Sequence, residues 1–271
     1  MKSPYYQSST VTAYHCRFQE IVSELPSSLL VVSDPPYNIG FKGYDEYSDN
    51  MHDEEYIEML AELQKFERVI LCDYPIETMK YIVPALGVPD HVGTWCYNSN
   101  APGRFRLISY YGCKPDYSRI LQPYKNMDDK RIKEAIANGS KGTPIYEWWT
   151  DIQQVKNVSE EKTNHPCPVP EALQGRIITL CANEGDVIFD PFGGSLTTSK
   201  AAQDLGFKSI ACELSENYLR EGIGRLAQQS FLTLPNNRLH LDVGDSPAQK
   251  DLFTLEAGSA AGKSPKPAPR R

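Results

Sequence analysis

Residues 186–213 constrain the fold of this chain more than any other segment. An apolar strand pattern is followed by Gly193 and Gly194, then by a helix pattern that stops at Gly206, and then by a second strand pattern that ends on Glu213. Strand, helix and strand within about thirty residues form a βαβ unit, which joins two parallel strands. The segment therefore predicts an α/β protein with a parallel sheet.

The same unit has the chemistry of a nucleoside site. Two glycines let the backbone approach a ligand closely, and Glu213 at the end of its strand can accept hydrogen bonds from both ribose hydroxyls. A phosphate-binding loop is the competing interpretation. The spacing G-x-x-x-x-G-K-[ST] is absent, Lys200 lies too far along the helix, and Asp190 would repel a phosphate. An uncharged or cationic nucleoside is favoured.

A second motif, Asp34-Pro35-Pro36-Tyr37, directly follows the apolar run 29–32. Ligands of open α/β sheets bind outside the carboxyl ends of strands, which is where this motif falls. Proline fixes its own φ, so the turn is stiff. The Asp34 carboxylate and the Pro35 carbonyl then form a rigid acceptor array beside the Tyr37 ring, suited to a planar, amine-bearing ring. An ordinary strand-to-turn exit with an exposed tyrosine is the alternative.

Together these residues resemble the amino-methylating DNA methyltransferases that use S-adenosylmethionine. Residues 34–37 look like the catalytic motif of that family, residues 190–195 look like its cofactor loop, and Glu213 looks like its ribose acid. Here the catalytic motif precedes the cofactor loop, an order characteristic of the permuted β group. Methylases acting on protein glutamine or ribosomal RNA usually place the cofactor loop first, so the order argues against them.

The resemblance implies a Rossmann-like, doubly wound, mostly parallel sheet with an inserted target-recognition segment. Residues 1–100 would be the catalytic half, 101–163 the target-recognition segment, 164–235 the cofactor-binding half and 236–271 an extension. It also implies S-adenosyl-L-methionine as cofactor. The residues expected to bind the cofactor are Asp190, Phe192, Gly193, Gly194, Ser195, Thr197, Glu213, His165 and Phe18.

Three of these positions carry alternatives. His165 lies in a segment that resembles the histidine–proline motif of the family, but its residue type alone favours a capping or loop histidine. Cys16-Arg17 stands where the family often has Gly-Asp, so stacking on Phe18 or backbone groups would hold the adenine of the cofactor. Leu196 replaces a third glycine, which leaves the contacts of Ser195 and Thr197 open.

The net charge of −7 is unevenly distributed along the chain. Residues 34–80 hold twelve acids against four bases, a net of −8, whereas residues 101–142 hold nine bases against four acids, a net of +5. The basic stretch also contains five aromatic residues, a composition suited to phosphate contact and base stacking. We therefore expect Arg104, Arg106 and Arg119 to contact double-stranded DNA, with solvent exposure or pairing to the acidic region as alternatives.

Composition bears on whether the protein is membrane-bound, exported or metal-binding. No run of eighteen apolar residues and no signal pattern is present, so we expect a soluble cytoplasmic protein without a membrane partner. Seven scattered cysteines form no C-x-x-C, which favours reduced thiols over a metal site. The Gly-, Ala-, Ser-, Pro- and Lys-rich residues 258–271 are expected to be disordered.

Local patterns predict further elements. Residues 11–33 would form a short helix and the catalytic strand, followed by a helix over 53–63 and a strand over 66–72. A helix over 75–86 and a strand over 91–97 come next. Residues 104–163 have weak periodicity and are left unassigned, and the spacing of apolar residues after Pro170 predicts a helix to Cys181.

The resulting hypothesis is a DNA adenine-N6 methyltransferase that flips its target base out of the duplex. Cytosine-N4 methylation obeys the same chemistry and remains an alternative, as does a catalytically silent nucleic-acid-binding relative. A restriction-enzyme partner and the choice between monomer and homodimer are left open by the sequence.

Overall fold

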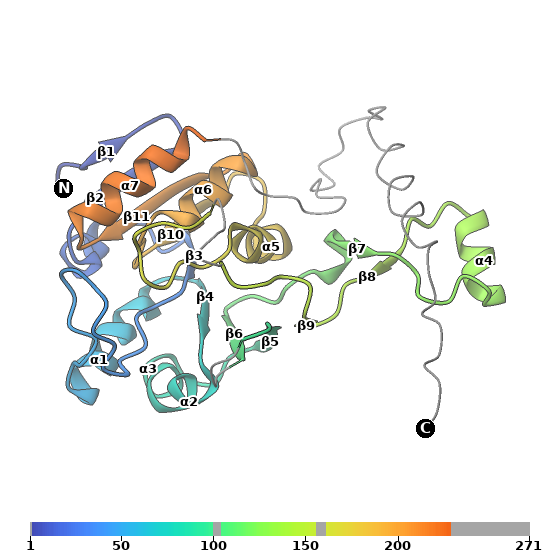
Figure 1. Cartoon of the computed structure of the whole chain (residues 1–271), viewed down its shortest axis with the longest axis horizontal. Helices are drawn as coiled ribbons and strands as arrows, with labels where there is room; N and C mark the ends of the chain where they lie inside the picture. Colours follow the sequence, from blue (N-terminus) through green and yellow to red (C-terminus); the bar gives the residue numbers. More distant parts are fainter. Residues whose placement is uncertain (1, 100–103, 156–160, 229–271) are drawn as a thin grey trace, which may run out of the picture. The chain divides into compact units, whose positions relative to one another are not determined.

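The computed structural model describes residues 2–99, 104–155 and 161–228. The predictions for residues 236–271 lie outside these ranges. A nine-stranded sheet has the order β1-β2-β11-β10-β3-β4-β6-β5-β9, and β7 and β8 form a separate pair (Figure 1). The strands are β1 (Tyr6–Gln7), β2 (Val11–His15), β3 (Leu30–Ser33), β4 (Arg68–Asp73), β5 (His91–Cys96), β6 (Phe105–Tyr111), β7 (Leu121–Gln122), β8 (Thr143–Pro144), β9 (Trp148–Trp149), β10 (Val187–Asp190) and β11 (Lys208–Glu213).

The centre of the sheet is parallel. Neighbours from β2 through β11, β10 and β3 to β4 pair in parallel, and β6 runs antiparallel to β4 and β5. From β10 the chain crosses to β11, whereas from β3 it crosses to β4 in the opposite direction. A switch point therefore lies between β10 and β3, where open α/β sheets bind their ligands. The predicted Rossmann-like, mostly parallel fold is confirmed.

Helices cover both faces of this sheet (Figure 1). Aromatic and aliphatic side chains of α1 and α3 pack with one face of β3, β4 and β10, whereas Leu219 of α7 packs with Ala13 and Ala211 on the other. Strands β2 and β11 contribute side chains to both of these cores, because successive strand residues point to opposite faces of the sheet. The helices are α1 (Asp53–Ala61), α2 (Pro75–Glu77), α3 (Val83–Leu86), α4 (Lys130–Ala137), α5 (Glu171–Cys181), α6 (Thr197–Asp204) and α7 (Glu216–Leu226).

Two local predictions are wrong in detail. Residues 11–15 form β2 rather than a helix, because Val11, Ala13 and Tyr14 are buried by parallel pairing with β11. Between β2 and β3 the chain forms two short 3₁₀ turns, over Phe18–Glu20 and Val22–Glu24. The helix expected over 75–86 is divided, since a π-helical turn at Thr78–Ile82 separates α2 from α3.

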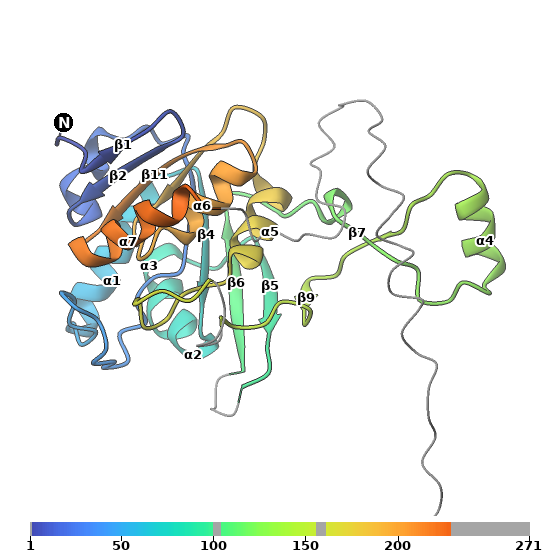
Figure 2. The same cartoon turned by 45° about the horizontal axis from the view of Figure 1, so that its top comes forward.

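The target-recognition segment expected at 101–163 begins inside the sheet. β6 pairs with β4 over residues 107–111 and with β5 over residues 105–110, so residues 105–111 are an interior strand of the sheet. The chain then leaves the sheet through β7, forms α4 and returns through β8 to β9, and α4 lies away from the main sheet in both views (Figures 1 and 2). Within the described ranges, no helix has the length and apolar character needed to cross a membrane.

Candidate active site

The two predicted motifs meet at the switch point of the sheet. β10 and β3 are paired neighbours, so Asp190 and Asp34 leave the same sheet edge side by side. The Ser33 hydroxyl donates a hydrogen bond of 2.5 Å to Asp190, which joins the two strand ends. Burial raises the pKa of Asp190, and the bonds from Ser33, Thr198 and the Phe192 amide oppose that rise.

Asp34 is hydrogen-bonded within its own motif. The Tyr37 hydroxyl lies 2.8 Å from both carboxylate oxygens of Asp34. Burial raises the pKa of Asp34 to about 6, while the positive charge of Arg106 and the Tyr37 bond hold it lower than burial alone would. The carboxyl is therefore ionised at neutral pH and is a strong hydrogen-bond acceptor in a water-poor site.

The ring of Tyr37 does not present the exposed face that its sequence position suggested. The residue is only 5% exposed, and the Arg106 guanidinium carbon lies 4.5 Å from its ring centroid. Tyr74 packs edge-on against the same ring, with centroids 5.0 Å apart. A role for Tyr37 in stacking on a base stays a prediction, and in this structure the ring is part of a packed aromatic cluster.

The turn after Tyr37 is fixed by a buried carboxylate that the sequence analysis missed. Asp49 is 2% exposed and accepts hydrogen bonds from the backbone amides of Asn38, Ile39 and Phe41, at 2.7, 3.1 and 3.1 Å. The Tyr56 hydroxyl donates to the Pro36 carbonyl. No residue in the described ranges donates to the Pro35 carbonyl, the second acceptor of the predicted array.

The glycine turn brings the backbone against Glu213. The Gly194 amide donates to one Glu213 oxygen and the Ser215 amide donates to the other, both at 2.8 Å. Gly194 has a φ of +51°, which favours glycine. Burial raises the pKa of Glu213, and these backbone bonds oppose it. The carboxylate is thus oriented at the end of β11, as expected for a ribose acceptor.

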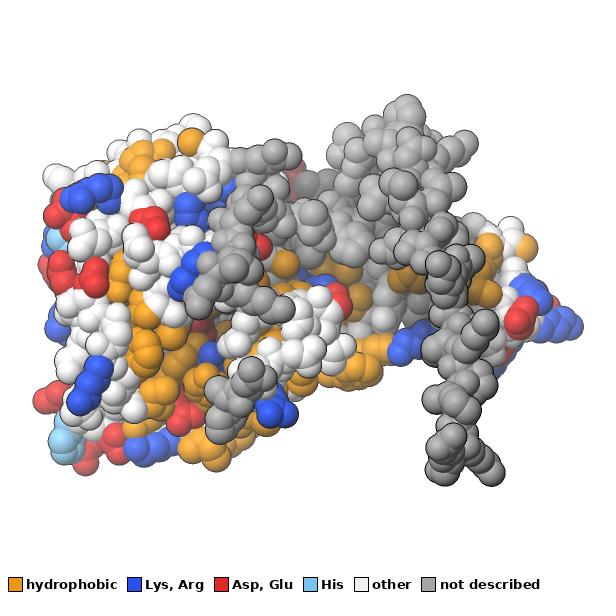
Figure 3. Space-filling model, in the orientation of Figure 1, with side chains coloured by type: hydrophobic (Ala, Val, Ile, Leu, Met, Phe, Trp, Pro, Cys, Tyr) orange, Lys and Arg blue, Asp and Glu red, His pale blue; other side chains and the backbone are white. Residues whose placement is uncertain are grey.

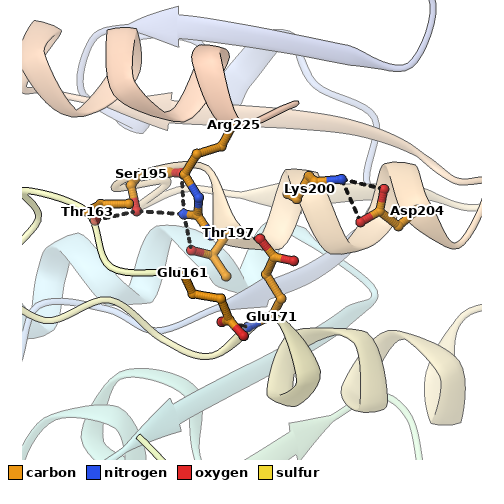
Figure 4. A network of polar contacts seen from close by, with 8 residues as sticks. All are labelled: Glu161, Thr163, Glu171, Ser195, Thr197, Lys200, Asp204 and Arg225. Atoms are coloured by element: carbon orange, nitrogen blue, oxygen red, sulfur yellow. Dashed lines mark hydrogen bonds and ion pairs between the residues drawn. The ribbon is translucent and has the colours of Figure 1, made fainter. Parts of the chain in front are cut away.

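The side chains of Ser195 and Thr197 bind the protein rather than pointing freely into a ligand site. Arg225 of α7 donates 3.2 Å hydrogen bonds to both hydroxyls and a 3.1 Å bond to the Ser195 carbonyl, and it forms a buried 2.7 Å ion pair with Glu171 (Figure 4). The Ser195 hydroxyl is also 3.3 Å from that of Thr163. Arg225 was not singled out from the sequence, because it lies thirty residues beyond the loop that it fixes.

Leu196, which stands where a third glycine was expected, adopts the conformation that glycine favours. Its φ is +57° and its ψ is +32°, a left-handed conformation that costs a branched residue about 1–2 kcal/mol. The side chain is 1% exposed and packs with Val11, Ala211 and Leu219. Burial of the leucine offsets this local strain, so the loop keeps its glycine-like path.

A pocket of about 1000 Å³, part of it open to solvent, connects the two motifs. Asp34 and Pro36 line it from the catalytic motif, and Glu213 lines it from the other side. The predicted cofactor-binding residues Asp190, Phe192, Gly193, Gly194, Ser195, Thr197, His165 and Phe18 also line it, as do Tyr44, Tyr47 and Gln174, which were not predicted. The structure thus brings every predicted site residue except Pro35 and Tyr37 to the wall of one cavity.

Phe18 and His165 lie at this wall in different settings. Phe18 is buried and packs edge-on against Phe192, with centroids 5.4 Å apart. His165 lies 4.7 Å from the Tyr218 ring, and its Nδ1 accepts a hydrogen bond from the Cys167 amide. Burial lowers the pKa of His165 to about 4, so the ring is neutral at physiological pH.

The expected phosphate contacts of two arginines are wrong. Arg106 is 6% exposed and stacks beneath the catalytic motif, 3.6 Å from the Tyr74 ring centroid. Arg119 donates to the carbonyls of Thr179 and Ala182, which end α5. Helix C-termini offer free carbonyls that favour a cation, so Arg119 has a structural role. Arg104 is exposed and stays a candidate.

Known proteins to which this chain is similar are methyltransferases. A family model for N6 and N4 amino-methylation, described as DNA methylase, matches residues 89–224. The type II methyltransferase M.ScaI of Streptomyces caespitosus is 27% identical over 261 residues, 84% of each chain. The DNA adenine methyltransferase YhdJ of Escherichia coli (strain K12) is 28% identical over 230 residues, covering 73% of this chain and 75% of that protein.

Solved structures have the same fold. The cytosine-N4-specific PvuII DNA methyltransferase superposes with a TM-score of 0.60 at 18% identity, covering 88% of this chain and 91% of the other. The M1.HpyAVI–SAM complex superposes with a TM-score of 0.54 at 18% identity, covering 80% and 100%. At these identities the likeness concerns the fold alone.

Proposed function

The chain belongs to the DNA methylase family of N6 and N4 amino-methyltransferases, and from this premise we propose that it methylates the N6 amine of an adenine flipped out of double-stranded DNA. The observation that carries the proposal is the single pocket shared by Asp34, at the end of β3, and Glu213, at the end of β11. One end of it offers an acceptor for a base amine, and the other offers an acceptor for ribose hydroxyls.

The pocket fits S-adenosyl-L-methionine as the methyl donor. Glu213 is held by two backbone amides and faces the cavity as a ribose acceptor, and Gly193 and Gly194 line the same cavity. Gln174 is 2% exposed, and its Oε1 is a buried acceptor without a partner among the described residues. Such an acceptor gains from a ligand N–H or O–H donor. When bound, the cofactor supplies an electrophilic methyl group on a cationic sulfur.

The residues of this chain activate the amine by position and charge. The lone pair of an exocyclic amine is delocalised into its ring, which makes it a poor nucleophile. Hydrogen bonds from the two amine N–H groups to Asp34 and to the Pro35 carbonyl favour a tetrahedral nitrogen, and Asp34 can accept the proton that the methylated nitrogen loses. Fixed acceptors in a buried site need no reorganisation during the reaction.

Adenine is the proposed target because an aspartate before Pro-Pro-Tyr resembles the adenine enzymes, and because the relative YhdJ is named as a DNA adenine methyltransferase. The fold is shared with an enzyme named for cytosine N4, so that amine is the alternative outcome of the test. A restriction-enzyme partner stays a prediction, supported by the relative M.ScaI, which is named a type II methyltransferase.

We place the DNA contact on the segment from β7 to β9, within the predicted target-recognition residues 101–163. Figure 3 shows Lys and Arg side chains at the outer end of this segment, where Figure 1 draws α4. Tyr146 and Trp148 are exposed and stack with an interplanar angle of 10°, and Lys125 Nζ lies 5.3 Å from the Tyr146 ring. Stacked aromatic faces beside a cation suit bases and phosphates.

Mass spectrometry of nucleosides tests the proposal directly. Unmethylated DNA is incubated with the full chain and labelled cofactor, digested to nucleosides and analysed, with the Asp34→Ala variant as the control for contaminating activity. Labelled N6-methyladenine that appears only with the unaltered chain is the expected result. Labelled N4-methylcytosine would move the target to cytosine, and cofactor binding without any labelled nucleoside would favour the silent relative.

A further inference from the structure

Arg106 is a buried cation of an unusual kind. Its guanidinium carbon lies 3.6 Å from the Tyr74 ring centroid, 4.5 Å from that of Tyr37 and 5.9 Å from that of Tyr97. Its Nε donates a 3.4 Å hydrogen bond to the Tyr97 hydroxyl, whereas Nη1 is buried with no partner among the described residues. The charge is therefore enclosed by aromatic rings, and no carboxylate of the residues that the structure describes forms an ion pair with it.

Two other buried arginines show the ordinary arrangement. Arg176 pairs with Asp151 at 2.5 Å, and Arg225 pairs with Glu171 at 2.7 Å. Burial of a charge without such a partner costs stability, and contact with aromatic faces offsets only part of that cost. A buried arginine without such a partner therefore points to a use for its charge.

The groups that face Asp34 identify this use. Tyr37, from the same turn, donates to it, and Asp190, from the neighbouring strand β10, adds a negative charge that disfavours its ionisation. The buried Asp73 at the end of β4 also interacts with it. Arg106, from β6, is the positive group in this set and acts most strongly to lower the pKa of Asp34 against burial.

We propose that Arg106 is a positioning residue that fixes the Tyr37 ring by stacking and keeps the Asp34 carboxylate charged inside its buried site. Arg106 therefore acts on Tyr37 by direct contact and on Asp34 through its positive charge. The inference rests on the proposed function for its catalytic meaning. Its electrostatic part concerns the protein alone and can be measured without turnover.

The test is a titration of the Asp34 carboxyl by carbon NMR from pH 4 to 9, with the signal assigned through an Asp34→Asn variant. In the unaltered chain we expect a midpoint near the pKa of about 6. Arg106→Gln should raise the midpoint by about one pH unit or more, because an opposite charge is lost. Arg106→Lys should retain most of the midpoint, because it keeps the charge but loses the planar fork.

Arg176→Gln is the matched control, since Arg176 is also buried and also faces an aromatic ring, that of Trp149 at 5.2 Å. It should lower the melting temperature without moving the Asp34 midpoint. An unmoved midpoint in Arg106→Gln, or equal shifts in the glutamine and lysine variants, would overturn the proposal. If Arg106→Gln does not fold, Arg106→Lys decides, and a midpoint moved by a full unit despite the retained charge would contradict us.

Turnover provides the second readout. The acid limb of the pH profile for single-turnover methyl transfer should follow the NMR midpoint in each variant. The plateau rate of Arg106→Lys should fall roughly tenfold to a hundredfold, because the Tyr37 ring is less well fixed. A plateau rate equal to that of the unaltered chain would refute the stacking role. Absence of transfer by the unaltered chain would contradict the proposed function while leaving the NMR result interpretable.

Discussion

The Tyr37 hydroxyl donates to the carboxylate of Asp34, the residue that we expect to hold the base amine, at 2.8 Å from both oxygens. A base entering the site must share or replace that bond. The exchange is nearly neutral in hydrogen bonds, since one donor takes the place of another. The half-buried Asp34 carboxylate is therefore paired with a donor both before and after a base enters.

Replacement of Asp34 by alanine should lower the rate of methyl transfer about a hundredfold to a thousandfold and leave cofactor binding within a few fold. The acid faces the base amine, and loss of one preorganised charged partner costs about a hundredfold to a thousandfold in rate. Single-turnover kinetics and calorimetry on the same preparation measure the two effects. A variant that loses cofactor binding outright, yet methylates at saturating cofactor, would show that the role of Asp34 is wrong.

Replacement of Glu213 by alanine should chiefly weaken cofactor binding. The loss of a buried acceptor costs on the order of 1–3 kcal/mol, or about tenfold to a hundredfold in affinity. Glu216 is the matched control, because its carboxylate is exposed at the start of α7 and bonds Tyr5 and Arg220. Calorimetry should give an unchanged dissociation constant for Glu216→Ala, and the same constant for Glu213→Ala would refute the assignment.

Alanine substitutions at two glycines of α7 should have opposite effects on stability. A Cβ at Gly222 would lie 2.7 Å from Leu196 Cγ and 2.8 Å from the Ser195 carbonyl group, whereas a Cβ at Gly224 meets nothing within 4 Å. Gly224→Ala should stabilise the protein by about 0.5–1 kcal/mol. Gly222→Ala should destabilise it by about 1–3 kcal/mol and weaken cofactor binding by displacing the loop. Urea denaturation and calorimetry on the pair separate helix propensity from contact with the cofactor loop.

His165 predicts a pH dependence of stability. Its pKa is lowered from 6.5 to about 4, so between these values the unfolded chain binds more protons than the folded one. Stability is then full above about pH 6.5 and is lost as the pH falls toward 4, by up to about 3 kcal/mol for this one group. Urea titrations at pH 7 and pH 4.5 measure the difference. His165→Gln should show a smaller difference, and an equal one would mean that other groups cause it.

Substitution of the exposed segment should affect DNA binding and not cofactor binding. Lys125→Ala should flatten the slope of log affinity against log salt by about one unit, the effect of one lost phosphate contact. Trp148→Ala should weaken binding by about 1–3 kcal/mol if a base stacks on it. Arg119→Ala is the structural control, which should lower the melting temperature and preserve the slope. A wild-type slope in a folded Lys125→Ala protein would remove that residue from the interface.

The sequence was sufficient for the parts of the site that depend on local order. Asp34 and Glu213 each end an apolar strand pattern, and parallel strands place their carboxyl ends at one sheet edge, so their convergence could be foreseen. The turn at Gly193 and Gly194 could also be predicted, because two glycines after a strand pattern favour a tight turn of the backbone.

The parts that escaped prediction depend on neighbours far apart in the chain. Counting charges placed Arg106 with exposed bases, but pairing of β6 with β4 and β5 turns it under the catalytic motif. Arg225 and Asp49 hold loops through backbone bonds whose partners have no distinctive residue type. β2 was missed because its longer partner strand, β11, lies almost 200 residues further along the chain.

The strand order imposes a sequence of events on folding. β2 and β3 are made early, but β11 and β10 lie between them in the sheet and are made more than 150 residues later. Until then β2 and β3 have no partner on their facing edges, and unpaired edges of a parallel sheet favour slow folding and association between chains. We expect a growing chain to depend on chaperones until residue 213 has emerged. The order of the two motifs along the chain thus delays formation of the central sheet as well as of the site.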